Sequence, residues 1–299
     1  MRVSTKMMFN QGLNALQRQQ NAMAEAQKEI SSGRKNLDPA KDPVGYATAS
    51  NLEISNKRLA QYERNIDFAR GKLELQEGVL ANATETLQRV KEISIEASNS
   101  LKLGEAGSAS RQALRDELAG LRESLMSQAN TRDERGEYVF SGTQSATAPY
   151  DAVGAYGLAP TAGSVNVQVA EGQDVEVYRT AGGVFNDGAD SIMQVIDQLD
   201  TAIAAGNMAD IATAQDRVDN VFDKVVTARG QIGNALSTLD RAFEDNDAQK
   251  YANQKALSDL RDTDYADAIT RLNMSMTTMQ ATQQTISKTQ SLSLFNFIG

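Results

Sequence analysis

The sequence predicts a mainly α-helical fold: an elongated bundle of long, coiled-coil-like helices with a small β-rich insert. Three observations predict it. Apolar residues recur at spacings of three and four over most of the chain, with charged residues between them. One central segment changes to period-two alternation. Only 5% of the 299 residues are aromatic and Trp is absent, which is typical of helical rods built from Ala, Leu, Ile and Met.

The changes of pattern divide the chain into five segments. Two ordinary domains, or one large one, fit this length. We expect an N-terminal helix over 1–42, the first part of a helical rod over 43–143, a β-rich insert over 144–186, a returning helical part over 187–255, and a C-terminal helix with an apolar tip over 256–299.

The N-terminal helix has a seam of apolar residues at heptad-like spacing, with Gln at two positions. Gly33 is expected to end it, because glycine readily adopts the left-handed conformation found after helix ends. Asp42 and Pro43 are expected to begin the next helix, as its cap and its first-turn proline. The N-terminal seam consists of Leu13, Leu16, Gln20, Met23, Gln27 and Ile30.

The second helix gives the strongest signal in the sequence. Its seam is apolar or aromatic at eleven of thirteen positions and uncharged at all of them. A helix over residues 44–102 would be about 90 Å long at ~1.5 Å per residue. A third amphipathic helix is expected over 107–132. The seam of the second helix consists of Leu59, Tyr62, Ile66, Ala69, Leu73, Gln76, Leu80, Ala83, Leu87, Val90, Ser94, Ala97 and Leu101.

The central insert is rich in glycine and carries much of the chain's acidic excess. Residues 164–170 and 174–180 alternate apolar and polar side chains, and the sequence EGQ lies between them. Two alternating runs around a short polar turn predict a β-hairpin.

Helix is expected again from about residue 190 and through 218–243, where Gly230 and Gly233 weaken it locally. The last helix mirrors the first, with Leu, Ile and Met interrupted by Gln. Two such seams predict that the chain ends pair with each other or with copies of each other. The C-terminal seam consists of Ile269, Leu272, Met276, Met279, Gln283, Ile286 and Gln290.

The chain finishes on an uncharged, apolar tip, LSLFNFIG. Because the long helices already supply a core, these side chains exceed what a monomer needs. We expect the tip to be an assembly contact, together with the nine apolar residues of the two terminal seams. The apolar residues of the tip are Leu292, Leu294, Phe295, Phe297 and Ile298.

The composition offers little for catalysis. The chain has no Cys and no His, so thiol chemistry, the usual proton shuttle and the commonest metal ligand are missing. Ser32 and Lys35 form a Ser-x-x-Lys without its accompanying Lys-Thr-Gly. DTDYAD at 262–267 lacks the Gly and Glu of a calcium loop and is better interpreted as a helix start. We predict no enzyme and no catalytic, cofactor-binding or metal residues.

Nucleic acid and membrane are not expected partners. The net charge of -9 argues against a basic nucleic-acid-binding face, and no run approaches the ~18 apolar residues of a membrane span. The N-terminus lacks the apolar core of a secretory signal. Met274, Met276 and Met279 could form a metal or oxidation site, but adaptable packing is the favoured interpretation.

Several motifs occur in an order that resembles one known family. They are MRVSTKMMFNQ, ISSGRKNLDPAKDPVGYATASNLE, TRDERGEYVFSGTQ, TARGQIGNALSTLD and LSDLRDTDYADAITRLN. Over about 1–144 and 185–299 the chain resembles the bacterial flagellins and their axial relatives, although Gly230 replaces the Ala common in that motif. The MRVST opening, the GEYVFSGTQ segment and the LSLFNFIG tip resemble the members that join hook to filament more than flagellin itself.

The resemblance implies a flagellin-like fold and a structural axial protein of the flagellum. It implies a protein secreted unfolded through the flagellar type III apparatus and located at the hook–filament junction, with no cofactor. The implied partners are the first hook-associated protein, flagellin, copies of the chain in a ring, and an export chaperone. A short flagellin, or an unrelated coiled-coil binding module, remain as alternatives, and an enzyme is the weakest one.

Overall fold

The computed structural model describes residues 2–35, 38–102, 108–159 and 163–298. The chain forms two compact units. The first unit combines Met1–Arg58 with Ala248–Gly299, and the second unit is Leu59–Asp247. Two long helices, α2 (Pro43–Lys102) and α6 (Met208–Arg261), contribute residues to both. Helices dominate and the described residues contain one two-stranded sheet, so the predicted mainly α fold class is confirmed.

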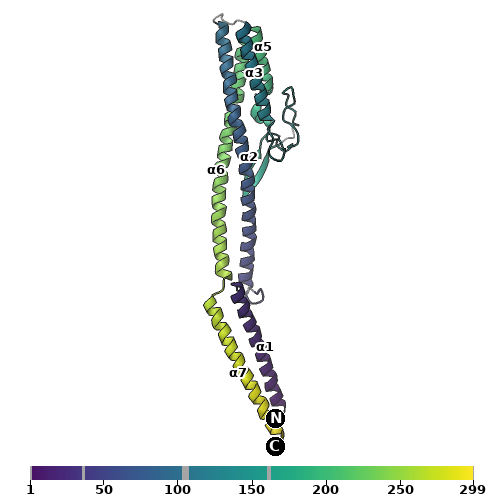
Figure 1. Ribbon diagram of the computed structural model, residues 1–299, viewed down its shortest axis with the longest axis vertical. Coiled ribbons are helices and arrows are strands. Elements are labelled where there is room, and N and C mark those ends of the chain that lie inside the picture. The colour runs from purple at the N-terminus through teal and green to yellow at the C-terminus, as the bar shows by residue number, and fades with distance from the viewer. Residues whose placement is uncertain (1, 36–37, 103–107, 160–162, 299) are drawn as a thin grey trace. The chain divides into compact units, whose positions relative to one another are not determined.

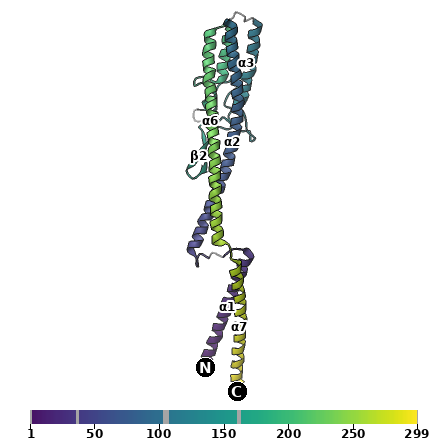
Figure 2. The ribbon, with the colours of Figure 1, turned by 90° about the vertical axis from the view of Figure 1, so that its left-hand side faces the viewer.

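In the first unit, α1 (Arg2–Ser32) and α7 (Tyr265–Ile298) lie side by side and antiparallel (Figures 1 and 2). Two contacts show the register. Arg271 Nη2 lies 2.7 Å from Glu29 Oε2, and a Cβ added to Gly12 would lie 3.0 Å from Ile286 Cγ1. The two helices that carry the terminal seams therefore pair within one chain.

The first unit also ties together the two places where the chain leaves its helices. Helix α1 ends at Gly33, as predicted, with φ of 70° and an N–H that donates to the Glu29 carbonyl at 2.8 Å. Beyond it, the Lys35 N–H donates to the Arg261 carbonyl at 2.7 Å. The Thr263 N–H donates to the Gly33 carbonyl at 3.0 Å. The end of α1 is thereby fixed to the turn between α6 and α7.

Carboxylates cap the starts of two helices in this unit. Asp42 precedes α2, and its Oδ1 accepts a hydrogen bond from the Gly45 N–H at 2.8 Å. Asp264 precedes α7, and its Oδ1 accepts from the Ala266 N–H at 2.9 Å. Side-chain oxygens at these positions satisfy N–H groups that have no partner inside the helix. The predicted proline-led start of α2 and the interpretation of DTDYAD as a helix start are both confirmed.

The second unit is built around the seam of α2. Helices α3 (Ser108–Ala129), α5 (Ile192–Ala205) and α6 contribute to the same apolar core (Figure 1). Twelve of the thirteen predicted seam residues are buried, and Leu101 packs partly buried against the core. The polar members have partners: Gln76 Nε2 donates to the Val177 carbonyl at 2.6 Å, and Ser94 Oγ donates to the Lys91 carbonyl at 2.7 Å.

Helices α5 and α6 form the return path. Ser191 and Gln194 make a reciprocal capping box at the start of α5. Helix α6 runs for 54 residues without interruption, including Gly230 and Gly233, where the sequence suggested a local weakening. Packing offsets the low helix propensity of glycine there. The apolar residues that α6 buries before, between and after the glycines include Val225, Ile232 and Leu239.

The predicted hairpin is present in the insert. Strands β1 (Val165–Ala170) and β2 (Gln173–Tyr178) pair antiparallel, with Gly172 at φ 72° in the turn. Helix amides hold the hairpin: Asn65 Nδ2 donates to the Gln168 carbonyl at 2.7 Å, and Asn246 Nδ2 donates to the Val169 carbonyl at 2.9 Å. The short helix α4 (Ala181–Phe185) follows. Elsewhere the described residues of 144–186 form turns and isolated bridges.

Candidate assembly surface

The nine apolar seam residues of the terminal helices all remain open to solvent. Leu13, Ile269 and Met276 are 41%, 46% and 39% exposed. A pair of helices has too little surface to enclose large side chains, so these residues remain available for contact with further helices. The other six are half-buried: Leu16, Met23, Ile30, Leu272, Met279 and Ile286.

Small residues are the ones that the helix pair buries. Ala26, Ala268 and Ser275 are 2%, 0% and 7% exposed. On α7, Ala268 and Ser275 share one face with Leu272 and Met279, at successive spacings of four, three and four residues. Small side chains let two helix backbones approach closely, and the larger neighbours then lie at the edges of the contact. We call this face of α7 the contact line.

Ile269 and Met276 lie beside the contact line rather than on it. They are seven residues apart and so share one side of α7, which we call the apolar flank. The sequence interpretation placed both in the seam because it ranked large apolar residues above Ala and Ser. Met274, by contrast, shares a face with Asp267, seven residues earlier, and is 68% exposed. Helix α7 therefore presents chemically different sides.

Ion pairs lie on the polar side of α7. Arg271 Nη2 lies 2.7 Å from Glu29 Oε2, and its Nε lies 2.9 Å from Asp267 Oδ2. The hydrogen bond to Glu29 raises the pKa of the Arg271 guanidinium above its usual value. Because exposed ion pairs contribute only about 0–1 kcal/mol, this cluster specifies the register of α1 and α7 more than it stabilises them.

The apolar residues of the tip lie outside the part of the chain whose side chains are described. The backbone of α7 is helical as far as Ile298. The assembly role of the tip therefore stays a prediction, which concerns Leu292, Leu294, Phe295, Phe297 and Ile298.

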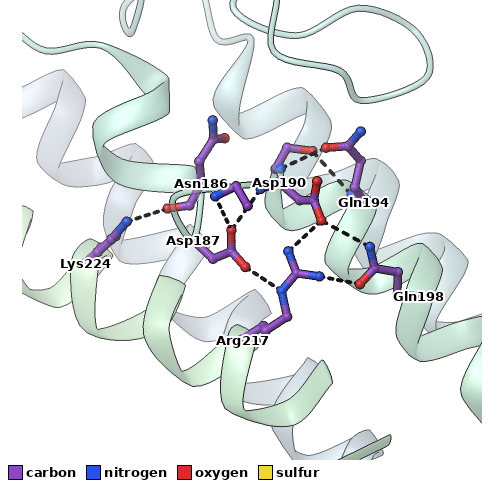
Figure 3. A network of polar contacts seen from close by, with 9 residues as sticks. Asn186, Asp187, Asp190, Gln194, Gln198, Arg217 and Lys224 are labelled. Atoms are coloured by element: carbon purple, nitrogen blue, oxygen red, sulfur yellow. Dashed lines mark hydrogen bonds and ion pairs between the residues drawn. The ribbon is translucent and has the colours of Figure 1, made fainter. Parts of the chain in front are cut away.

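A polar network in the second unit fixes the loop between α4 and α5 (Figure 3). Arg217 on α6 donates to Asp187, to Gln198 and, at 2.6 Å, to Asp190 Oδ2. Asp187 Oδ1 also accepts from the N–H groups of Ala189 and Asp190, both at 2.9 Å. Burial opposes the charge on Asp187, but these donors outweigh it and lower its pKa to about 2. No local motif signals this network, because Arg217 is distant in sequence from the loop.

A buried ion pair attaches the segment after α3 to α2. Lys72 is 8% exposed and pairs with Asp133, whose Oδ1 accepts from the N–H groups of Arg135 at 2.8 Å and Glu137 at 3.0 Å. Burial disfavours both charges. The Lys72 ammonium and the N–H donors nevertheless lower the pKa of Asp133, and Asp133 together with Tyr178 raises that of Lys72. In the sequence, Lys72 is indistinguishable from the solvated charges around it.

The described residues contain few features of a site for a metal ion or a small ligand. Within the described residues no cluster of three acidic side chains could hold a metal ion, and no helix is apolar over a length that would cross a membrane. A groove of about 510 Å³ lies between β2, α4 and α6. Its basic side chains are already engaged: Arg179 lies 3.2 Å from Glu176, and Lys224 donates to the Asn186 carbonyl at 2.9 Å.

Comparison with known proteins identifies the family. The bacterial flagellin N-terminal helical region matches residues 3–145, and the bacterial flagellin C-terminal helical region matches residues 215–298. The chain belongs to the bacterial flagellin family. The family predicted from the sequence is thus confirmed.

Similar members of the flagellin family include both hook-associated proteins and flagellins. Flagellar hook-associated protein 3 of Salmonella typhimurium is 29% identical over 99% of each chain. The flagellin of Bacillus subtilis is 23% identical, covering 95% of this chain and 94% of its own. A solved structure of a candidate flagellar hook-associated protein from Vibrio parahaemolyticus is 26% identical, with a TM-score of 0.66 over 74% of this chain and 100% of that one.

The two flagellin-family matches contain all nine apolar seam residues of α1 and α7. The N-terminal match agrees with the motifs found over about 1–144, whereas the C-terminal match begins at residue 215 rather than 185. The hairpin and the loop between α4 and α5 lie between the two matches. The surface proposed for assembly therefore lies in the family-defining part of the chain.

Proposed function

We propose that this chain is a structural axial protein of the bacterial flagellum that forms the junction between hook and filament. The observation that carries the proposal is the paired α1 and α7, with nine large apolar side chains left open, in a chain similar over its full length to hook-associated protein 3. An open apolar surface of this kind is typical of a subunit that completes its core in an assembly.

The proposed mechanism is helix packing. The nine seam residues and the five apolar residues of the tip are buried against neighbouring subunits in a ring. Each Leu- or Met-sized side chain contributes about 1.5–3 kcal/mol when it becomes fully buried. Several half-buried side chains per subunit can therefore order a helix pair that is marginal alone.

The proposed partners follow from a position in the axial structure. They are the first hook-associated protein, flagellin, further copies of this chain, and an export chaperone that covers the tip beforehand. The chain would be secreted to the flagellum, with no role for nucleic acid, membrane or cofactor. Its relatives are structural proteins, which favours a subunit that is not an enzyme.

Antibody labelling in electron micrographs tests the position. We expect label confined to the base of the filament, and deletion of the gene should release flagellin into the medium while hooks remain. Label along the whole filament, with loss of the filament subunit on deletion, would instead identify a short flagellin.

Paired substitutions test the surface. Ile269→Lys places a charge on the apolar flank of α7, whereas Met274→Lys places it on the exposed polar side. We expect Ile269→Lys to abolish labelling of the filament base and Met274→Lys to preserve it, with the second unit folded in both, as judged by urea unfolding. Equal labelling of the two variants would exclude the apolar flank as an assembly surface without affecting the proposed position.

A further inference from the structure

The oxidisable sulfur of this chain is concentrated in its terminal helices. The chain has ten Met, no Cys and no Trp, so methionine is its only readily oxidised sulfur. Of the methionines outside the ends of the chain, Met193 is fully buried in the core of the second unit. Seven of the ten lie in residues 1–32 or 265–298: Met1, Met7, Met8, Met23, Met274, Met276 and Met279.

Met276 combines two properties that its neighbours on α7 do not share. It is 39% exposed, so an oxidant in solution reaches it. It also lies on the apolar flank with Ile269, where contact with another subunit would remove it from water. Met274 is more exposed, at 68%, but lies on the polar side of the helix beside Asp267. Met279 is half-buried on the contact line.

The chemistry requires only a peroxide. The thioether sulfur of Met276 attacks one oxygen of hydrogen peroxide, the O–O bond breaks, and an S–O bond forms. The sulfur loses two electrons to become a sulfoxide, and the second oxygen leaves as water after proton transfer. The product is polar and accepts hydrogen bonds, so its burial in an apolar contact is disfavoured. Methionine sulfoxide reductases reverse the reaction.

We propose that Met276 is a site of reversible oxidation at which peroxide weakens the attachment of this subunit to its neighbours. The proposal rests on the proposed function, because it requires the apolar flank to be an assembly contact. It assigns to Met276 a role beyond the adaptable packing that Met provides: the side chain is a contact only while its sulfur is reduced.

The experiment compares reduced and oxidised full-length chain on its target. The chain is treated with hydrogen peroxide, separated from it, and added to hook-ended flagellar stubs isolated from cells in which its gene is deleted. Bound chain is counted with antibody in electron micrographs, and mass mapping gives the sulfoxide content of each methionine. Met276→Leu keeps the apolar flank without the sulfur, and Met274→Leu is the matched control.

We expect peroxide to oxidise Met276 well before Met193. Oxidation should weaken binding of the wild-type chain and of Met274→Leu by about tenfold or more. Binding of Met276→Leu should stay within about twofold, and treatment with methionine sulfoxide reductases should restore the wild-type chain.

Undiminished binding of a chain oxidised at Met276 would overturn the proposal. So would an equal loss in the Met276→Leu variant, which would place the sensitivity at another methionine. If the untreated chain fails to bind the stubs, the proposed junction function fails and the oxidation site with it. The untreated arm therefore separates the two proposals.

Discussion

Two regions of this molecule carry the same heptad-like pattern and differ in what covers it. In α2, twelve of thirteen seam positions are buried, whereas in α1 and α7 none of the nine is. The side chains of α2 contribute to a core shared with α3, α5, α6 and the hairpin. In the structure α1 and α7 pack against each other. The pattern thus indicates which face of a helix is apolar, and the number of packed neighbours decides whether that face is buried.

The rate of amide hydrogen exchange should differ most between the two regions. In the dilute monomer we expect amides of residues 10–30 and 265–286 to exchange at least about 10³-fold faster than those of 66–97, because the former open locally and the latter require global unfolding. Mass spectrometry on proteolytic fragments measures both regions in one sample. Strong protection of the terminal helices would show that the pair is stable alone and would remove the reason to expect ordering by assembly.

The next largest difference should be in the stability lost when an ion pair of each unit is broken. Asp133→Ala removes the close partner of the buried Lys72 charge and leaves Glu137 Oε2 at 3.9 Å. We expect a loss of about 3–5 kcal/mol in the free energy of unfolding. Glu25→Ala removes the exposed partner of Lys41 in the first unit, and should cost less than about 1 kcal/mol. Urea unfolding measures both.

A second substitution distinguishes charge from packing at the buried pair. Adding Lys72→Met to Asp133→Ala removes the uncompensated charge, so part of the lost stability should return. If the double variant is no more stable than Asp133→Ala, the single loss came from disturbed packing around the segment after α3.

Matched leucines test the seams themselves. Leu80 is fully buried in α2, whereas Leu16 is half-buried in α1. We expect Leu80→Ala to cost about 2–5 kcal/mol, since it leaves a cavity, and Leu16→Ala to cost less than about 1 kcal/mol in the monomer. Unfolding in urea, followed by circular dichroism, gives both values. Equal losses would mean that α1 belongs to the cooperative core.

The sequence predicts the elements whose signals are local. The α2 seam follows from periodicity, the end of α1 from Gly33, the start of α2 from Pro43, and the hairpin from alternation. Each of these features depends on residues within a few positions of one another, so it can be predicted without knowing which distant segments meet in the fold.

The contacts that the sequence does not predict join distant residues or small ones. Arg217 pairs with Asp187, thirty residues away in the sequence, and Lys72 pairs with Asp133, sixty-one residues away. Ala268 and Ser275 are buried in the helix pair, yet apolar periodicity ranks Ile269 and Met276 first because their side chains are larger. The sequence therefore predicts that the two terminal helices pair, as the structure shows, but not that small residues of α7 are the ones buried in the pair.

The Asp187 network should give the smallest effect, and it is the one that depends on pH. The folded-state pKa of about 2 lies below the usual 3.8. The contribution of the carboxylate to stability is therefore fully present above pH 4 and is lost as the pH falls toward 2. We expect Asp187→Asn to cost about 2 kcal/mol at pH 7, measured by urea unfolding. The difference from the wild type should shrink as the pH falls from about 4 to 2.

Acid affects every carboxylate in the chain, so the informative quantity is the difference between variant and wild type at each pH. Asp174→Asn, at an exposed position in β2, is the matched control, and should stay within about 0.5 kcal/mol of the wild type throughout. If the stability difference between Asp187→Asn and the wild type persists unchanged to pH 2, the substitution disturbs the shape of the loop rather than its charge. If the difference in the free energy of unfolding between Asp187→Asn and the wild type disappears by pH 2, the network depends on an ionised Asp187 that the loop shields from water. The second unit, unlike the terminal pair, is then held by buried charge as well as by its apolar core.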